Sequence, residues 1–408
     1  MSSNYRNFRN SVPWLIFFLE AVFIILFCFL YSDDGVSGSN ISYPAFQDVS
    51  HMVIFGLGFF LAFLKRYKFS STGFNLLLIV LGVQWSVLME GLLFFLFQNE
   101  KEDDLKSITK ATVSMTTVVI SSAAVLGKAN PIQLIVMTIV EIAAFHLSRW
   151  INKMYLKIGD SVGMMHVHLF GAYFGLAVSP FFSEPSPNSE KNASTPESDL
   201  LSMLGTLFLW VFWPSFNSVL AVEEEKNTII YNTYFALAVS AVTAFALSVL
   251  TTKDGKLRMK HIHSATLAGG VTVGYAAHSI WYPSIAMILG LLASVITVLG
   301  SHHLQRCLNS VLKIHDASGI HFTFGLPGVL GAIAHVILFV VKNWTDLRSQ
   351  RYLIMIEIGT FCLTISVALI SGFITGCILN LKLLKTIPVS KYCEDQFYWE
   401  FPHLAVGF

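Results

Sequence analysis

The sequence predicts an all-α membrane protein that crosses the bilayer many times. Hydrophobic residues make up 54% of the 408 residues and charged residues only 12%, which is about half the charged share of a typical soluble protein. A helix needs roughly 20 apolar residues to span the hydrocarbon core, where each backbone amide must be satisfied within its own segment. Many stretches meet this requirement. The composition argues strongly against a soluble protein, and the net charge of +1 argues against a nucleic-acid partner.

Twelve segments of the chain are predicted to span the membrane as helices. The first follows Arg6 and Arg9, is too long for the core of a signal peptide and contains no small-residue cleavage site, so we expect a signal anchor. We expect an N-terminus at 1–11, one membrane domain at 12–384 and a C-terminal tail at 385–408. The predicted spans are 12–31, 46–65, 73–98, 108–127, 130–149, 161–182, 199–221, 229–250, 264–283, 284–304, 317–341 and 352–381.

The distribution of basic residues predicts which helix ends face the cytoplasm. An even number of spans places both termini on one side, and with both inside, most of the 26 Lys and Arg residues fall in inner segments, where they are favoured. Both termini are therefore predicted to be cytoplasmic. The sequon at Asn40 then lies in the first outer loop, where a glycan can be attached, whereas that at Asn192 lies inside and stays unused. The sequon at Asn343 lies outside but close to the membrane, and its modification stays open.

Several ionisable side chains lie within the predicted spans, where a charge is expensive, so each is a functional candidate. A lone Glu in a helical bundle more often forms a hydrogen bond with a neighbouring helix. His168 is a stronger candidate because it follows a predicted helix start at Asp160 by about 12 Å, at 1.5 Å per residue, and so lies toward mid-membrane. Asp160 is well placed to cap that helix. The full set is Glu20, Glu90, Glu141, His146, His166, His168, His278, His321, His335 and Glu357.

Catalytic and metal-binding patterns are missing from the sequence. The five cysteines have no CxxC spacing, and no HExxH motif occurs. We therefore expect no enzyme activity, no cofactor and no metal. Cys307, beside Arg306 and just after a predicted helix end, is a candidate for palmitoylation, with a free thiol as the equal alternative.

The sequence resembles one known family over nearly its whole length. From Asp160 to Leu176 the stretch DSVGMMHVHLFGAYFGL is similar to the Rh branch of the ammonium transporter superfamily. The ending from Lys391 resembles the erythrocyte Rh D/CE blood-group type rather than the Rh-associated glycoprotein. The resemblance implies an inverted five-plus-five repeat of helices preceded by one extra helix, assembled as a plasma-membrane trimer with a narrow path through each subunit. Other matching stretches are GVQW (82–85), AVLGK (124–128), GTLFLWVFWPSFNS (205–218), NTYF (232–235), ATLAGGV (265–271) and HDASGIHFTFGLPG (315–328).

The resemblance also assigns residues to that path. In conducting members of the family, two histidines line the path in contact with each other. Here His168 matches the first position and Phe324, before Gly-Leu-Pro-Gly, matches the second. Aromatic residues cover the outer mouth, where Phe216 with Trp213 matches one position and Ser122 matches the other. The matched vestibule residue is Asp160, and those of the inner mouth are His321 and His315.

The replacement of the second histidine leaves two functions open. Ammonium pays a large desolvation penalty in an apolar channel and neutral ammonia does not, so a path gains from aromatic faces that hold the cation and imidazoles that handle its proton. With Phe324, paired imidazoles cannot form. One function is therefore a poorly conducting or occluded subunit of an erythrocyte Rh complex, which pairs with the Rh-associated glycoprotein and through it with the membrane skeleton. The other is a channel for ammonia or carbon dioxide in which His168 and backbone carbonyls suffice.

Overall fold

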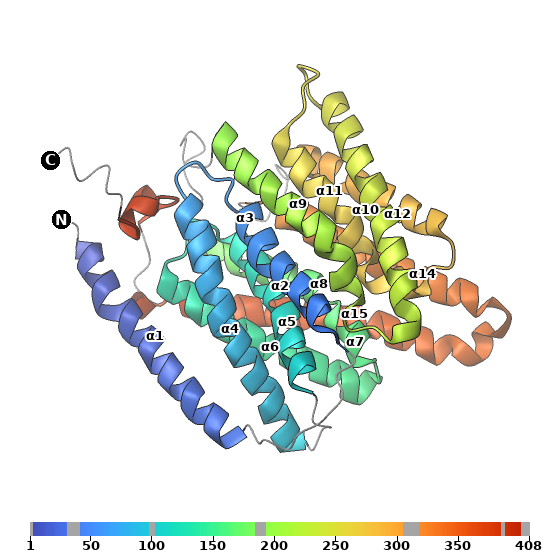
Figure 1. Ribbon diagram of the computed structural model, residues 1–408, viewed down its shortest axis with the longest axis horizontal. Coiled ribbons are helices and arrows are strands. Elements are labelled where there is room, and N and C mark those ends of the chain that lie inside the picture. The colour runs from blue at the N-terminus through green and yellow to red at the C-terminus, as the bar shows by residue number, and fades with distance from the viewer. Residues whose placement is uncertain are drawn as a thin grey trace.

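The computed structural model describes residues 3–30, 41–97, 103–183, 193–304, 316, 318–384 and 388–400, which form a helical bundle without a β-strand (Figure 1). Each of the twelve predicted spans contains a helix. The α-helices are α1 (Ser3–Leu30), α2 (Tyr43–His51), α3 (Leu57–Phe60), α4 (Lys68–Phe97), α5 (Asp104–Ala124), α6 (Pro131–Leu156), α7 (Asp160–Met164), α8 (Val167–Val178), α9 (Pro196–Ser218), α10 (Glu223–Thr251), α11 (Met259–Ala276), α12 (Pro283–Leu299), α14 (Leu326–Lys342) and α15 (Leu347–Leu379).

Short π-helical and 3₁₀ turns extend or join several of these helices. A π-turn adds one residue to the helical turn, which redirects the side chains that follow it, and such turns are frequent at functional sites. The π-turns are η1 (Met52–Gly56), η5 (Gly300–Leu304) and η6 (His321–Gly325), and the 3₁₀ turns are η2 (Ser179–Phe181), η4 (Ala277–Ser279), η7 (Trp344–Asp346), η8 (Lys382–Leu384), η9 (Val389–Lys391) and η10 (Asp395–Phe397).

Two of the predicted spans are more polar than the rest and form the inside of the bundle. Within the described residues, nine helices are long and apolar enough to cross a bilayer, and neither α5 nor α11 is among them. Every residue is buried from Thr109 to Ala124 in α5 and from His261 to Ala276 in α11. Their hydroxyl and imidazole groups therefore face other helices instead of lipid, which explains why these helices tolerate a lower hydropathy.

Small residues set the register between α8 and α5. A Cβ atom on Gly171 would lie 2.5 Å from the carbonyl oxygen of Thr117, and one on Gly175 would lie 2.7 Å from Cα of Ser121. Equal steps along both helices mean that they run parallel with their backbones in contact. These two glycines, four residues apart, thus allow the close contact between α8 and α5.

The predicted helix at 46–65 is not continuous in the structure. It is divided into α2, η1 and α3 where it crosses α9. At the crossing, a Cβ atom on Gly205 would overlap the backbone nitrogen of Phe60 and would lie 2.7 Å from the carbonyl oxygen of Gly56. The apolar run at 46–65 predicted the span, but an apolar run carries no information about a π-turn within it.

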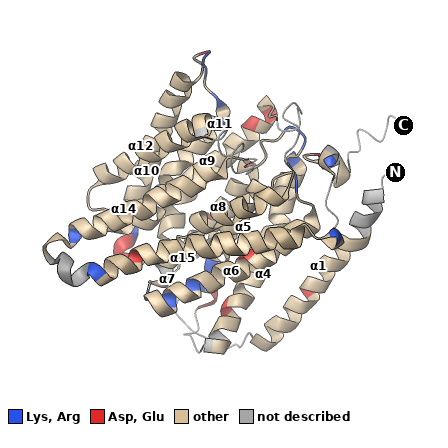
Figure 2. Cartoon of the chain, turned by 180° about the vertical axis from the view of Figure 1, so that it is seen from behind, with Lys and Arg blue, Asp and Glu red and all other residues tan. Residues whose placement is uncertain are grey.

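Charged residues lie mostly toward the helix ends and in the loops, and most of the helix lengths carry other residues (Figure 2). The beginning of α1 and the C-terminal segment 388–400 lie on the same side of the bundle (Figures 1 and 2). We call this side the tail end and the opposite side the far end. Helix α1 packs at the edge of the bundle, chiefly against α4.

The C-terminal segment 388–400 is docked against the tail end by specific contacts. The carboxylate of Asp395 accepts the backbone N–H groups of Phe69 and Ser70, at 3.0 and 2.7 Å, at the beginning of α4. The indole Nε1–H of Trp399 donates to Oγ of Ser70 at 2.9 Å. The backbone N–H of Cys393 donates to the carbonyl oxygen of Gly127, in the turn between α5 and α6, at 2.8 Å. Asp395 thus satisfies orphan N–H groups at a helix start, as an N-cap residue does from within its own helix.

Replacing Asp395 by Ala is expected to lower the free energy of unfolding by about 1 to 2 kcal/mol, because two helix-end N–H groups, that of Ser70 buried and that of Phe69 partly buried, lose their acceptor. Thermal unfolding of the purified chain in detergent, followed by circular dichroism, measures this change. Glu400→Ala is the matched control, since Glu400 is an exposed acidic residue of the same segment. Equal stability of the two variants would contradict a capping role for Asp395.

Candidate functional site

His168 lies in α8 within a group of aromatic rings. We call this group the His168 cluster; its other members are Trp213 and Phe216 of α9 and Phe324 of η6. The imidazole stacks on the Trp213 ring, with centroids 5.4 Å and planes 15° apart, and meets the Phe216 ring edge-on at 5.6 Å. All four side chains are buried. The structure therefore brings four of the six residues assigned to the transport path into one place.

Phe324 is a further aromatic neighbour of His168. The two rings are nearly parallel, with 6.1 Å between centroids and 10° between planes. The ring of Phe60 meets Phe324 from behind, edge-on at 6.1 Å. A phenyl ring has no donor or acceptor, and Nε2 of His168 is buried without a hydrogen-bond partner. An apolar plug thus stands where a second imidazole would give His168 a partner.

The backbone of η6 positions Phe324 in this cluster. The turn is anchored by Asp316, whose carboxylate accepts the backbone N–H groups of residues 319–321 at 2.8, 3.0 and 2.9 Å. Two threonine hydroxyl groups hold the chain before and after Phe324. That of Thr297 donates to the carbonyl oxygen of Phe322 at 2.8 Å, and that of Thr272 donates to the carbonyl oxygen of Pro327 at 3.1 Å. Hydrogen bonds thus hold the backbone on both sides of Phe324.

Two residues of this region were not predicted from the sequence. The Phe60 ring that contacts Phe324 also meets the imidazole of His263 edge-on at 5.4 Å. His263 is buried, and Phe60 thus lies between the His168 cluster and a further histidine. The predicted span at 264–283 begins one residue after His263, so that residue was counted as part of a loop. A boundary set one turn earlier would have found it.

His321 does not join the His168 cluster. Its ring lies at the edge of Tyr173, with centroids 6.1 Å apart, and its Nδ1 is buried without a hydrogen-bond partner. The other residue predicted for the inner mouth, His315, lies outside the described residues. The same holds for the predicted glycosylation site Asn40 and the predicted palmitoylation site Cys307.

Asp160 is the first residue of α7, and the cap position belongs to Gly159. The predicted helix at 161–182 is divided into α7, α8 and η2, with a break at Met165 and His166. The predicted helix start at Asp160 agrees with the structure, but the predicted capping residue, Asp160, lies one position after the observed one, Gly159. His168 consequently stands in the first turn of α8 rather than in the middle of one long helix.

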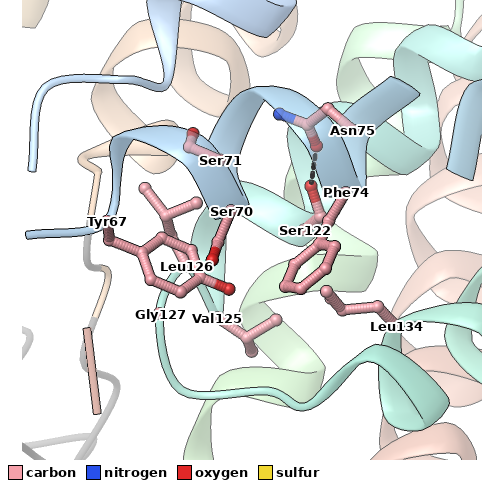
Figure 3. A pocket seen from close by; sticks show the side chains of 10 residues that line it. All are labelled: Tyr67, Ser70, Ser71, Phe74, Asn75, Ser122, Val125, Leu126, Gly127 and Leu134. Atoms are coloured by element: carbon pink, nitrogen blue, oxygen red, sulfur yellow. Dashed lines mark hydrogen bonds between the residues drawn. The ribbon is translucent and has the colours of Figure 1, made fainter. Parts of the chain in front are cut away.

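The prediction that Ser122 shares the outer gate with Phe216 is wrong. Ser122 lies near the tail end, where its hydroxyl donates to Val119 at 2.8 Å and contacts Oδ1 of Asn75 at 3.4 Å (Figure 3). Helix α9 begins at the tail end, where Nζ of Lys68 forms an ion pair with Glu197 at 3.3 Å, and Phe216 lies near the opposite end of α9. From Glu197, Phe216 is about 28 Å along the helix axis. The motif match had therefore assigned the second gate position to the wrong residue of α5.

A small pocket surrounds Ser122 instead. Its lining includes Tyr67 and Ser70 from the start of α4, Asn75 one turn later and Gly127 from the α5–α6 turn, the same elements that hold the C-terminal segment (Figure 3). Asn75 is buried, and its Nδ2 has no hydrogen-bond partner. The pocket is therefore part of the docking region of the tail and is separate from the His168 cluster.

A bundle with two central polar helices, two broken helices and a buried His–aromatic cluster is matched by one family of transport proteins. The model of the Ammonium Transporter Family covers residues 13–399, so the chain belongs to that family. Over its full length the chain is 43% identical to the RH-like protein of Macaca mulatta and 41% identical to the blood group Rh(CE) and Rh(D) polypeptides of Homo sapiens, each matched over its entire length. Within the family, its relatives are thus the Rh polypeptides.

Solved structures show the same fold. The structure titled "Nitrosomonas europaea Rh50 and mechanism of conduction by Rhesus protein family of channels" superposes with a TM-score of 0.75 and 29% identity, covering 89% of this chain and 93% of that one. A "Sensor Amt Protein" follows with a TM-score of 0.66 and 20% identity, over 85% and 94% of the two chains. The predicted family and fold class, an all-α multi-pass membrane protein of the ammonium-transporter type, are confirmed, and this family consists of transporters rather than enzymes.

Proposed function

We propose that this chain is a poorly conducting or occluded subunit of an Rh membrane complex. The observation that carries the proposal is the stack of Phe324 on His168, 6.1 Å apart and within 10° of parallel. Trp213 is a second ring nearly parallel to the imidazole, with centroids 5.4 Å apart. Its buried Nε2 meets no donor or acceptor.

The chemistry of ammonium explains why such a plug would suppress conduction. A cation that leaves water must exchange its hydration for other hydrogen bonds or give up a proton, because burial of an unpaired charge costs many kcal/mol. Phe324 and Phe60 offer neither acceptors nor proton-accepting groups beside His168. Both rings are also buried among other side chains, so a passing molecule would have to displace them.

Such a subunit would act by assembling with others. We propose a plasma-membrane trimer with both termini and the 385–408 tail in the cytoplasm, containing like subunits or the Rh-associated glycoprotein, and linked through it to the red-cell membrane skeleton. In support, α9 and α10 expose large apolar side chains such as Leu200, Val211, Val242 and Leu250. These faces suit lipid or a neighbouring subunit and do not suit water.

A flux measurement tests the proposal. The purified chain in liposomes is expected to pass ammonia or methylamine at the rate of empty vesicles, measured by stopped-flow with a pH-sensitive dye inside. His168→Ala provides the control and is expected to leave that rate unchanged. Flux above background that His168→Ala abolishes would overturn the proposal.

The same result would establish the second candidate, a channel for ammonia or carbon dioxide. One observation favours it: His168 stays in the first position, and its Nε2 is free to accept or donate a hydrogen bond. In that case the rings of Phe324 and Phe60 would move aside, and His168 alone would provide the polar contact in the path.

A further inference from the structure

A groove lies between the α3–α4 turn and the docked C-terminal segment. Its volume is about 440 Å³, and its walls are formed by residues 65, 66, 68 and 69 on one side and by 394–396 on the other. We call it the tail groove. A volume of this size falls within the range of pockets that hold small molecules. The tail groove shares no lining residue with the small pocket around Ser122.

Three residues of the first wall are basic, and the backbone of their turn is fixed. The N–H group of Lys65 donates to the carbonyl oxygen of Ala193 at 3.0 Å. The carbonyl oxygen of Arg66 accepts the N–H group of Asp395 at 2.8 Å. The next side chain, that of Tyr67, is buried and lines the small pocket described above (Figure 3). Lys65 and Arg66 are exposed, so they stand at the surface on a turn that is already in place.

The acidic residues of the tail groove leave a positive charge in its lining. Three basic residues stand against two carboxylates, those of Glu394 and Asp395, so the lining carries a net charge of +1. Both oxygens of Asp395 already accept N–H groups at the start of α4, at 3.0 and 2.7 Å. Lys68 also pairs with Glu197, but that glutamate is 84% exposed, and such surface pairs contribute little. An anion is therefore the complementary ligand.

The tail groove lies at the level of a membrane surface. The spanning part of α4 begins at Lys68, which lines the groove. The ring of the next residue, Phe69, is 55% exposed and also belongs to the lining. Aromatic and basic side chains at the end of a spanning helix are typical of the zone of lipid headgroups. A soluble anion would match the charges of this groove but would leave the apolar ring in water.

We propose that the tail groove binds the headgroup of an anionic phospholipid. The phosphate lies against Lys65 and Arg66, where a guanidinium group can donate two parallel hydrogen bonds to it. The rest of the headgroup fills the space toward residues 394–396, and the acyl chains leave past Phe69 into the bilayer. Anionic lipids are concentrated in the cytoplasmic leaflet, which agrees with the proposed cytoplasmic tail. The inference goes beyond the proposed function, because no residue of the His168 cluster takes part.

Thermal unfolding in nanodiscs measures this binding. The full chain is placed in nanodiscs of phosphatidylcholine that contain an increasing share of phosphatidylinositol, whose headgroup is anionic. A ligand that binds the folded state raises the melting temperature as its concentration exceeds Kd. We expect a rise that saturates with phosphatidylinositol, and no rise when phosphatidylethanolamine, which has no net charge, replaces it at the same share.

The source of the phosphate is tested separately. Inorganic phosphate and inositol monophosphate, which is the same headgroup without acyl chains, are added at constant ionic strength to nanodiscs of phosphatidylcholine alone. Neither is expected to raise the melting temperature, because neither has acyl chains that hold it at the membrane beside Phe69. A rise equal to that with phosphatidylinositol would assign the groove to a soluble phosphate compound and would overturn the lipid proposal.

Variants that remove charge locate the site. Lys65→Gln combined with Arg66→Gln is expected to weaken the binding of phosphatidylinositol about tenfold or more, since each basic residue near a membrane surface contributes about fivefold. The matched control is Lys253→Gln combined with Lys256→Gln, two exposed basic residues in the turn between α10 and α11. That turn also lies at the tail end, because α9 begins there and α10 runs back, but it does not line the groove. The control is expected to bind like the wild type.

The comparison of the two double variants decides the proposal. An equal rise in melting temperature in both would overturn it, because the effect would then come from the charge of the whole tail end. No rise in the wild type, or an equal rise with phosphatidylethanolamine, would also overturn it. Lys65 and Arg66 are exposed, and the carbonyl oxygen that holds the tail belongs to the backbone, so their replacement should preserve the fold. If the double variant does not fold, Arg66→Gln carries the test, with Lys253→Gln as its control.

Discussion

Replacing Phe324 by His is expected to raise ammonia flux in liposomes at least about tenfold over the wild type, which corresponds to a barrier lower by about 1.4 kcal/mol. The new imidazole would lie where the phenyl ring now stacks, 6.1 Å from His168 between ring centroids. It would give the unpartnered Nε2 of His168 a donor or acceptor and would open a smaller, polar position in the apolar plug. Stopped-flow measurement of the internal pH provides the rate.

Two controls identify the cause of that gain. Phe324→Leu also removes the aromatic ring but adds no polar group, so a gain in this variant would show that the space matters and the imidazole does not. The double substitution Phe324→His with His168→Ala should return the rate to that of the wild type, because the pair is then incomplete. If Phe324→His leaves the flux unchanged while the wild type conducts, the occluded-subunit proposal is wrong and the channel proposal stands.

Replacing Gly205 by Ala is expected to have the largest effect on stability, with a loss of about 3 kcal/mol or more in the free energy of unfolding. The added Cβ atom would overlap the backbone nitrogen of Phe60 and would lie 2.7 Å from the carbonyl oxygen of Gly56. Because these atoms belong to the backbone, a change of rotamer cannot relieve the overlap. The crossing of α9 with η1 and α3 would have to widen, and this would loosen the packing of α9, which carries Trp213 and Phe216.

Thermal unfolding in detergent and the yield of folded chain measure this effect. Gly359→Ala is the matched control, because Gly359 is also a glycine within a spanning helix and has no neighbour within 4 Å of the added Cβ atom. It is expected to be neutral or slightly stabilising, since Ala is favoured over Gly in a helix by about 1 kcal/mol. Equal stability of the two variants would show that the α9 crossing can widen freely.

The positions of the helices could be predicted because apolar runs of membrane length are a direct consequence of burial in lipid. Each of the twelve predicted spans contains a helix, including the polar α5 and α11. The breaks in these helices could not be predicted. The π-turn at Met52–Gly56 lies where the backbone of α9 crosses, and neither this turn nor the break at Met165 has a local sequence pattern such as a proline.

The site was predictable only in part, because a motif fixes the identity of a residue but not its height in the bundle. His168 and Phe324 were correctly paired, since both lie next to glycine-rich motifs that anchor the match. Ser122 was assigned to the wrong end although it lies two residues before the matched stretch AVLGK (124–128), because a matched stretch does not show which end of the bundle it occupies. His335 and Glu357 were each noted as single ionisable residues, and the contact between them depends on how α14 and α15 are rotated.

The docked C-terminal segment means that the start of α4 can be completed only late in the synthesis of the chain. The N–H group of Ser70 and the carboxylate that accepts it are 325 residues apart in the chain. The beginning of α4 therefore stays incomplete until the chain has been synthesised as far as Asp395. A chain that ends prematurely, even after all of its membrane spans, would keep these amides uncapped and the pocket around Ser122 uncovered.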